Sequence, residues 1–290
     1  MTQARKLEQS SELKAWEYWT GQPDGALKGW VCSYIGYCEN PGRPVSRLEV
    51  PKNRVILILG FGDRLSIRSV NARTSADQYA AFIADFGANP LITEYEGVQR
   101  CIEIELFPWA INTLFGCPPI ELTKGCVHLE ALWGAATSLL LERLSEMPTW
   151  QSRFDLVNQI LIAKIAASTS TVPPEIQWAW HQLENQGGCV PIRQLAQTIG
   201  WSDRYFAAGF REHVGITPKV AARRIRFNRA VQRLEADNSC SLSDLAASCG
   251  YSDQSHFARE FRLFAGCSAK VYQQAQFRDI LGISSNIVEV

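Results

Sequence analysis

Arginine is the residue type with the clearest chemistry in the C-terminal third of this chain, and that chemistry is anion binding. Residues 191–279 hold 13 Lys and Arg against 8 Asp and Glu, a net charge of +5, whereas residues 1–190 hold 16 against 20, a net charge of −4. A basic segment on a neutral chain is typical of a phosphate-binding surface. Five arginines within one predicted helix either bind phosphate or form a solvated face: Arg223, Arg224, Arg226, Arg229 and Arg233.

Catalytic residue types form no telling pattern. The sequence contains no nucleophile elbow, no phosphate-cradling glycine loop and no Cys-His or His-Asp pairing at an informative spacing, and GFGD at 60–63 is typical of a hairpin turn. A metal-dependent barrel needs His and carboxylate ligands on its strands. All four histidines lie outside the predicted strands, so we expect no metal site there: His128, His181, His213 and His256. Because no catalytic pattern is present, we also expect neither an enzyme nor a cofactor.

The basic segment contains one pattern twice. IRQLAQTIGWSDRYFAAGFREHVGITPKVA begins at Ile192, and LSDLAASCGYSDQSHFAREFRLFAGCSAKVY begins at Leu242. Identical residues recur at an offset of fifty and, after one extra residue, of fifty-one, which indicates a repeated structural unit. In the first copy these residues are Leu195, Ala196, Gly200, Ser202, Asp203, Phe206, Phe210, Arg211 and Gly215.

Each copy predicts two short helices joined by a tight turn. Leu195, Ala196 and Ile199 share one helix face, and Gly200 supplies the conformation that ends a helix. Ser202 is a good N-cap for the next helix, which buries Phe206 and Phe210. This is the pattern of a helix-turn-helix, whose second helix enters the major groove of DNA. An all-α bundle without a role in DNA binding is the alternative.

The two copies and the helix between them resemble the DNA-binding domain of AraC-family bacterial transcription regulators. Arg226-Phe227, Ala230 and Leu234 are similar to the linker-helix pattern R-L-x-x-A-x-x-x-L of that family, and GYSDQSHFAREFRLFAGCSAKVYQ is similar to its signature. The resemblance covers about one hundred residues. The chain departs from the family pattern at three positions: Gly209, where a larger residue is usual, Ala269 in place of Pro, and Gln273 in place of Arg.

The resemblance implies which side chains face DNA. Arg pairs well with guanine and Gln with adenine, while Ala offers only apolar contact, for example with a thymine methyl group. Arg211 and Arg262 are implied to contact phosphate. The positions implied to face bases are Arg204, Ala207 and Ala208 in the first copy, and Gln254, Ser255, His256 and Arg259 in the second.

The rest of the chain predicts a second domain, so the fold class is α+β. We expect an effector-binding and dimerisation domain at 1–170, strand-rich over 29–107 and helical over 108–167, then a linker at 171–179, the DNA-binding domain at 180–280 and a tail at 281–290. The resemblance implies a cupin-like barrel for the strands. The expected strands are Trp30–Tyr37, Arg47–Val50, Val55–Phe61, Leu65–Ile67, Ala80–Ile83 and Gln99–Leu106. The expected helices are Trp109–Phe115, Leu129–Met147, a helix from the N-cap Thr149 through Ala167, one that starts at Pro174, and Lys219–Asp237.

These features lead to one principal interpretation and two alternatives. The principal one is a cytoplasmic, ligand-responsive transcription regulator, which we expect to be an activator. It is expected to bind double-stranded promoter DNA and an unknown small-molecule effector. RNA polymerase and a second copy of the chain are candidate partners, and no membrane association is expected. The nine cysteines, which form no CxxC pair, keep open a thiol- or metal-responsive sensor, or an enzyme-like domain, fused to a DNA-binding tail. The second alternative is a helical interaction protein that does not bind DNA.

Overall fold

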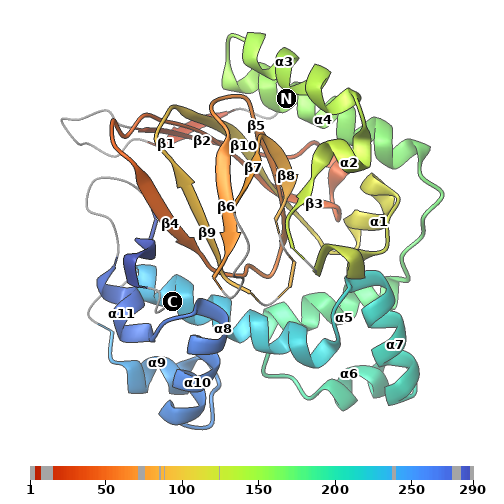
Figure 1. Ribbon diagram of the computed structural model, residues 1–290. Coiled ribbons are helices and arrows are strands. Elements are labelled where there is room, and N and C mark those ends of the chain that lie inside the picture. Colours follow the sequence, from red (N-terminus) through yellow and green to blue (C-terminus); the bar gives the residue numbers. More distant parts are fainter. Residues whose placement is uncertain are drawn as a thin grey trace.

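The computed structural model describes residues 4–7, 16–70, 76–84, 86–87, 89–123, 125–236, 240–275 and 282–287. Figure 1 shows two antiparallel sheets with helices in one half of the molecule and an all-helical half below them. The α+β class is therefore confirmed. Residue 281 and residues 288–290 of the expected tail lie outside the described residues, as does Asp237 at the end of the expected linker helix.

The larger sheet has seven strands in the order β1-β2-β3-β10-β5-β8-β11, and the smaller has four in the order β4-β9-β6-β7. Every pairing is antiparallel. The larger sheet comprises β1 (Arg5–Leu7), β2 (Trp16–Gly21), β3 (Val31–Glu39), β10 (Gln99–Leu106), β5 (Val55–Gly60), β8 (Ala81–Ile83) and β11 (Val127–His128). The smaller comprises β4 (Val45–Glu49), β9 (Leu91–Tyr95), β6 (Leu65–Ser69) and β7 (Asp77–Tyr79).

All six expected strands are present, and the sequence prediction missed five others. One of these corrects the statement that every histidine lies outside the strands: His128 belongs to β11, pairs with Phe82 and stacks on the ring of Tyr79 with 4.2 Å between centroids. Strand β11 has only two residues, which are too few to show the alternation of apolar and polar residues from which strands are predicted. Within the described residues, no group of three or more His, Cys, Asp or Glu is placed to hold a metal ion.

The central strand β5 explains the apolar run VILILG. Val55, Leu57 and Leu59 are buried in the core beneath the helices, while Ile56 and Ile58 point into the narrow space between the two sheets. A strand that is covered on both faces has a continuous apolar sequence, and not an alternation of apolar and polar residues.

Four helices cover the larger sheet: α1 (Ala110–Phe115), α2 (Leu129–Trp133), α3 (Ala136–Glu146) and α4 (Trp150–Ala167). The expected single helix Leu129–Met147 is wrong, because Gly134 adopts φ +61° and divides it into α2 and α3. Thr149 caps α4 as expected, in a capping box with Ser152. Two glycines of the sheet allow α4 to approach, since a Cβ on Gly36 or Gly21 would lie within 2.7 Å of the Trp150 or Phe154 ring.

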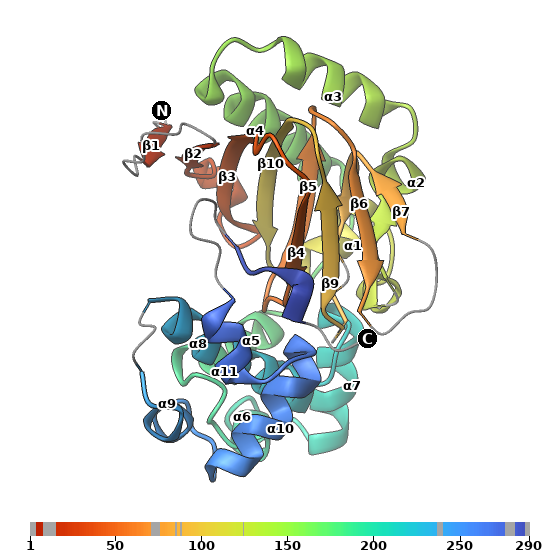
Figure 2. The same cartoon turned by 60° about the vertical axis from the view of Figure 1, so that its left-hand side comes forward.

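The helical half contains α5 (Pro174–Asn185), α6 (Ile192–Thr198), α7 (Asp203–Val214), α8 (Pro218–Ala236), α9 (Leu242–Ser248), α10 (Gln254–Ala265) and α11 (Ala269–Gln274). Residues 174–179 belong to α5, so the segment between α4 and α5 is 168–173 and is shorter than the expected linker. Figure 2 shows α6, α9 and α10 at the end of the molecule away from the sheets. None of the helices in the described ranges is long and apolar enough to cross a bilayer.

The first helix-turn-helix shares its core with the sheet half, whereas the second has a core largely of its own. Leu195, Phe206 and Phe210 belong to the same buried cluster as the strands and α4. Phe257 and Phe261 belong to a separate cluster with the second half of α8. Helix α7 also packs on the short 3-10 helix η2 (Pro119–Thr123). The first motif is therefore the one that is fixed to the sheet half.

This shared packing gives a testable consequence at Gly215, which ends α7 with φ +88° and whose Cβ, if present, would lie 2.9 Å from the Pro119 backbone. Gly215→Ala should reduce the free energy of unfolding by about 2 kcal/mol or more, since it adds a backbone clash to left-handed strain of about 1–2 kcal/mol. Gly200→Ala is the matched control, because Gly200 has φ +74° and nothing within 4 Å. Equal losses for both variants in urea unfolding of the full chain would contradict the packing of α7 on η2.

Candidate nucleic-acid interface and the joint above it

The first recognition helix, α7, begins as the sequence predicts. Gly200 has φ +74° at the turn, and the Ser202 hydroxyl accepts a hydrogen bond from the Tyr205 N–H at 3.2 Å. Phe206 and Phe210 are fully buried beneath the helix. This anchoring leaves the opposite face of the helix toward solvent, where Arg204, Ala208 and Arg211 are exposed and Ala207 is half-buried.

The second recognition helix, α10, is capped one residue later than the first. Asp253 is its N-cap, and the carboxylate accepts from the His256 N–H at 2.7 Å. That bond, with one from the Ser252 hydroxyl, lowers the pKa of Asp253. The different cap accounts for the extra residue between the two copies, since α7 begins at Asp203 and α10 at Gln254.

The residues proposed to face DNA in α10 divide into two groups. Gln254, Ser255, Arg259 and Arg262 are exposed. His256 is half-buried and held within the protein: Nδ1 lies 3.1 Å from the Ser252 hydroxyl, and Nε2 lies 3.9 Å from a carboxylate oxygen of Glu260. The ring is therefore less available to a base than its neighbours are.

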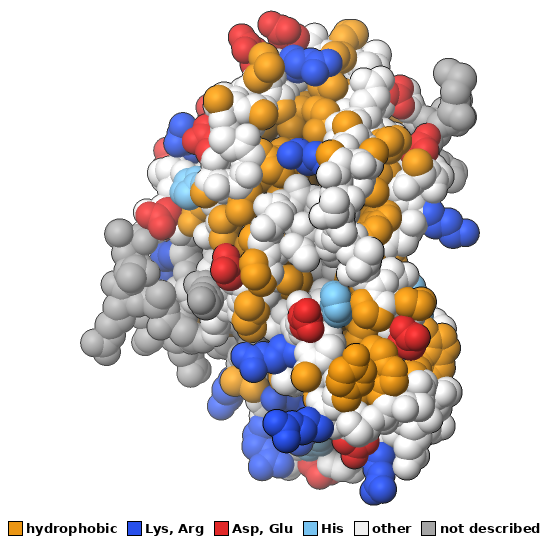
Figure 3. Space-filling model, turned by 90° about the vertical axis from the view of Figure 1, so that its right-hand side faces the viewer, with side chains coloured by type: hydrophobic (Ala, Val, Ile, Leu, Met, Phe, Trp, Pro, Cys, Tyr) orange, Lys and Arg blue, Asp and Glu red, His pale blue; other side chains and the backbone are white. Residues whose placement is uncertain are grey.

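Sequence reasoning missed Tyr205, which lies beside Arg204 at the start of α7. Its side chain is 62% exposed and packs edge-on against Trp201 at 4.7 Å. An aromatic ring exposed next to an arginine on a recognition helix can offer stacking or apolar contact. Its position three residues after the capping Ser202 was the available signal. Figure 3 shows Lys and Arg side chains projecting from the lower end of the molecule, in the helical half.

The linker-helix arginines do not form one solvated face. Arg224 is 1% exposed, and Arg223 and Arg226 contact the buried carboxylate of Glu260. Arg233 donates to the Ser248 hydroxyl and Arg229 lies against Gly187. Most of these side chains therefore serve contacts within the protein. The exposed positive charge that remains for phosphate includes Arg204 and Arg211 on α7 and Arg259 and Arg262 on α10.

Burial makes several of the cysteine thiols poorly suited to act as redox or metal sensors. Cys249 and Cys267 are core residues, and burial raises the pKa of Cys267 to about 11. Burial also raises the pKa of Cys32 to about 11 and that of Cys117 above its usual range. Since the thiolate is the reactive form, these groups are less reactive than an ordinary cysteine.

Comparisons with known proteins agree with this geometry. Residues 195–275 match a family model described as "Helix-turn-helix domain". YkgA from Escherichia coli (strain K12), named as an HTH-type transcriptional regulator, is 30% identical over 110 residues, 37% of this chain and 44% of YkgA. The HTH-type transcriptional activator RhaS from Pectobacterium carotovorum subsp. carotovorum (strain PC1) is 36% identical over 52 residues, 18% of each chain. The C-terminal helices form a helix-turn-helix domain of the AraC type.

The matched regions are short: the chain spans less than half the length of these two relatives. Among solved structures, ToxT from Vibrio cholerae superposes with a TM-score of 0.48 and 10% identity, over 83% of this chain and 97% of that chain.

The AraC-type domain is joined to the sheet half by polar contacts from α8. Arg224 Nη1 donates to the Phe86 carbonyl at 2.8 Å, Nη2 donates to the Lys52 carbonyl, and the guanidinium lies 4.4 Å from the Phe86 ring centroid. One turn later, Asn228 donates to the Pro51 carbonyl at 2.9 Å. The loop between β4 and β5 is thus bound along α8, and the buried Arg224 donates both to this loop and to the Phe86 carbonyl between β8 and β9.

A second contact joins the same loop to α5. Asn53 donates to Glu184 Oε1 at 2.9 Å, and Arg54 forms an ion pair with the same carboxylate. The Arg54 guanidinium also lies 4.7 Å from the Phe107 ring centroid. The loop 50–54 therefore contacts two helices of the helical half, α5 and α8, at once.

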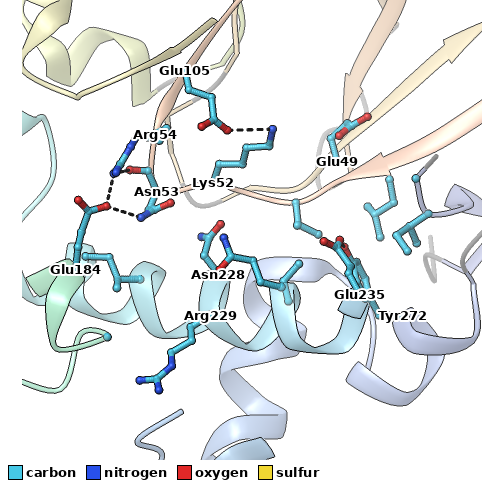
Figure 4. A pocket seen from close by; sticks show the side chains of 18 of the residues that line it. Glu49, Lys52, Asn53, Arg54, Glu105, Glu184, Asn228, Arg229, Glu235 and Tyr272 are labelled. Atoms are coloured by element: carbon cyan, nitrogen blue, oxygen red, sulfur yellow. Dashed lines mark hydrogen bonds and ion pairs between the residues drawn. The ribbon is translucent and has the colours of Figure 1, made fainter. Parts of the chain in front are cut away.

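An open cavity of about 760 Å³ lies between the two halves beside this loop (Figure 4). Lys52 crosses its upper side toward Glu105, with 3.7 Å between the charged atoms, while Asn228 and Glu235 rise from α8 below. Burial raises the pKa of Glu235, which also accepts from the Tyr272 hydroxyl at 2.9 Å. The polar lining comprises Glu49, Lys52, Asn53, Arg54, Glu105, Glu184, Asn185, Asn228, Arg229, Gln232 and Glu235.

The contacts of the buried Arg224 between α8 and the sheet half can be tested by mutation. Arg224→Ala should lower the free energy of unfolding of the full chain by about 2–4 kcal/mol, because the buried Phe86 carbonyl and the partly buried Lys52 carbonyl would both lose a charged donor. Arg229→Ala is the control: Figure 4 shows Arg229 directed away from the loop, and its loss should cost about 0.5 kcal/mol or less. Urea unfolding measures the free energy of unfolding of both variants. A loss for Arg224→Ala as small as that of the control would contradict the role of Arg224 in joining α8 to the sheet half.

Proposed function

We propose that this chain is a sequence-specific, ligand-responsive transcription regulator that binds double-stranded DNA. The observation that carries the proposal is the pair of capped recognition helices, α7 and α10, which both pack against α8 and both expose polar side chains. An all-helical interaction protein does not require this duplication of cap, turn and exposed face. The AraC-type assignment of residues 195–275 supports the same conclusion.

The two recognition helices read different base pairs in this proposal. Arg204 contacts a guanine, Ala207 and Ala208 make apolar contact, and Arg211 binds phosphate. In α10, Gln254 contacts an adenine, Ser255 and Arg259 complete the base contacts, and Arg262 binds phosphate. His256 takes a supporting role because both ring nitrogens face protein groups. Since the two surfaces differ, the DNA site is not a palindrome.

The effector site in this proposal is the cavity between the two halves. Ligand pockets usually enclose about 300–1,000 Å³, and the cavity of about 760 Å³ lies in that range. The space between the two sheets is about 100 Å³, too small for most effectors. A small polar molecule in the cavity would touch both the 50–54 loop and α8. It would shift the balance between arrangements of the two halves by its difference in affinity for them.

A second copy of the chain is the proposed partner of α3. Leu139 is 59% exposed on that helix, while Leu140 and Leu144 are buried toward the protein. Pairing there would double the number of recognition helices and raise the avidity for tandem sites. RNA polymerase is a further partner in the regulator proposal.

DNA binding is tested with duplexes selected from a random pool by the full chain, with affinity measured over a range of salt concentrations. Arg204→Ala and Arg259→Ala should each weaken binding by about 1–3 kcal/mol and relax the preference at one or two base pairs. Arg262→Ala should weaken binding to all duplexes about equally, with a smaller salt dependence.

The control for this experiment is Arg64→Ala, which removes one exposed positive charge between β5 and β6, outside α3 and the helical half. It should leave both affinity and sequence preference unchanged. The proposal fails if the folded chain selects no sequence, or if Arg64→Ala weakens binding as much as Arg204→Ala does.

A further inference from the structure

The second recognition helix contains a buried carboxylate. Glu260 is 4% exposed and occupies the inner face of α10 together with Phe257, Phe261 and Phe264. Burial of an ionised carboxylate costs several kcal/mol unless paired charges and hydrogen bonds offset it. Apolar packing alone would therefore not favour a glutamate at this position. The contacts of its carboxylate indicate its role.

Its partners come from the linker helix. Arg223 Nε donates to Glu260 Oε2 at 2.7 Å, and Arg226 Nη2 lies 4.0 Å from Oε1. The two arginines are three residues apart and so share one face of α8. Both also lie over aromatic rings of the second motif, Arg223 over Phe264 at 5.5 Å and Arg226 over Tyr251 at 5.7 Å.

Arg226 extends this contact to the first motif. Its Nη1 donates to the Gly188 carbonyl at 2.7 Å, in the turn that leads from α5 into α6. A chain of polar contacts therefore runs from α10 through Glu260 and Arg226 to the entry of the first helix-turn-helix. On its other side Glu260 reaches the recognition surface, since His256 lies 3.9 Å from Oε2.

Apolar packing does not fill the space that this chain of contacts crosses. An open cleft of about 710 Å³ separates the two motifs there and is lined by residues from the 188–192 segment, α8 and α10. The first motif packs into the core of the sheet half, and the second packs into its own. At this face the motifs are joined by α8, by the contacts of Glu260 and by Cys189, whose thiol lies 3.8 Å from the Cys249 carbonyl oxygen. Of these, only the contacts of Glu260 are ionic.

We propose that Glu260 is a positioning residue that sets the spacing between the two DNA elements read by one chain. Its carboxylate, bound to Arg223 and Arg226, fixes α10 relative to α8 and to the entry of the first motif. Arg223 and Arg226 then serve geometry and not phosphate binding. This inference rests on the proposed function and specifies how its two recognition helices act together.

The experiment compares spacing preference in the full chain and its variants. Duplexes that carry both selected elements are prepared with the selected spacing, and with one or two base pairs added or removed. Each added base pair rotates one element by about a tenth of a turn about the DNA axis, since a turn contains about 10 base pairs. The unaltered chain should bind the selected spacing about tenfold or more tightly than the altered ones, a difference of about 1.4 kcal/mol.

Glu260→Gln should reduce that ratio to about threefold or less, because the amide is similar in shape but does not hold two guanidinium groups by charge. Arg223→Gln removes the shortest contact from the other side and should have the same effect. Glu212→Gln is the control, since Glu212 is exposed on α7, and should keep the ratio of the unaltered chain. Partial unfolding would weaken binding to every duplex alike and leave the ratio unchanged.

An unchanged spacing ratio in both Glu260→Gln and Arg223→Gln would overturn the positioning role while leaving the proposed function intact. Failure of the unaltered chain to bind any duplex would instead overturn the proposed function, and this inference with it. Loss of the ratio in the Glu212→Gln control would also count against the inference, because the effect would then follow from charge alone.

Discussion

The fold depends on helix α8, which packs against the sheet half, the first motif and the second motif at once. Its first half contributes Ala221, Ala222 and Ile225 to the core shared by the sheets and the first motif. Its second half contributes Phe227, Ala230 and Leu234 to the core of the second motif. Between them Arg224 reaches the sheet half. At 19 residues the helix is about 28 Å long, so it fixes the distance between the motifs.

This constraint explains why a buried arginine, Arg224, lies between α8 and the sheet half. Small side chains on α8 let it approach the neighbouring helices closely, but the loop before β5 presents backbone carbonyls and not apolar side chains. Carbonyl groups buried without donors are costly, and one guanidinium can satisfy two of them. The same contacts connect the 50–54 loop, the polar cavity and the linker helix. A molecule bound in the cavity would therefore act on the element that holds both recognition helices.

The local structure of the helical half could be predicted from its sequence because it depends on short-range rules. Gly200, Ser202 and Thr217-Pro218 specify where helices end and begin, and the repeat identifies the equivalent residues of the second motif. The exposed faces of α7 and α10 follow from the buried Phe206, Phe210, Phe257 and Phe261. The strands with strong apolar character were predictable for a similar reason.

The contacts between distant segments could not be predicted. Arg224 has the same local sequence signature as an exposed helix arginine, and its burial depends on Phe86 and on Lys52, which lies 172 residues away. Glu260 occupies a position that the apolar period assigns to the core, but nothing nearby in the sequence indicates Arg223 as its partner. The break at Gly134 was missed because one glycine within a helical pattern is often tolerated.

The most direct test of this account is hydroxyl-radical footprinting of the full chain on a duplex recovered from the genome that encodes it. The account predicts two protected segments of different sequence, about 10 base pairs apart on one face of the DNA, for each bound protomer. A single protected segment per protomer, a short palindrome within the reach of one protomer, or no sequence-specific protection would contradict it.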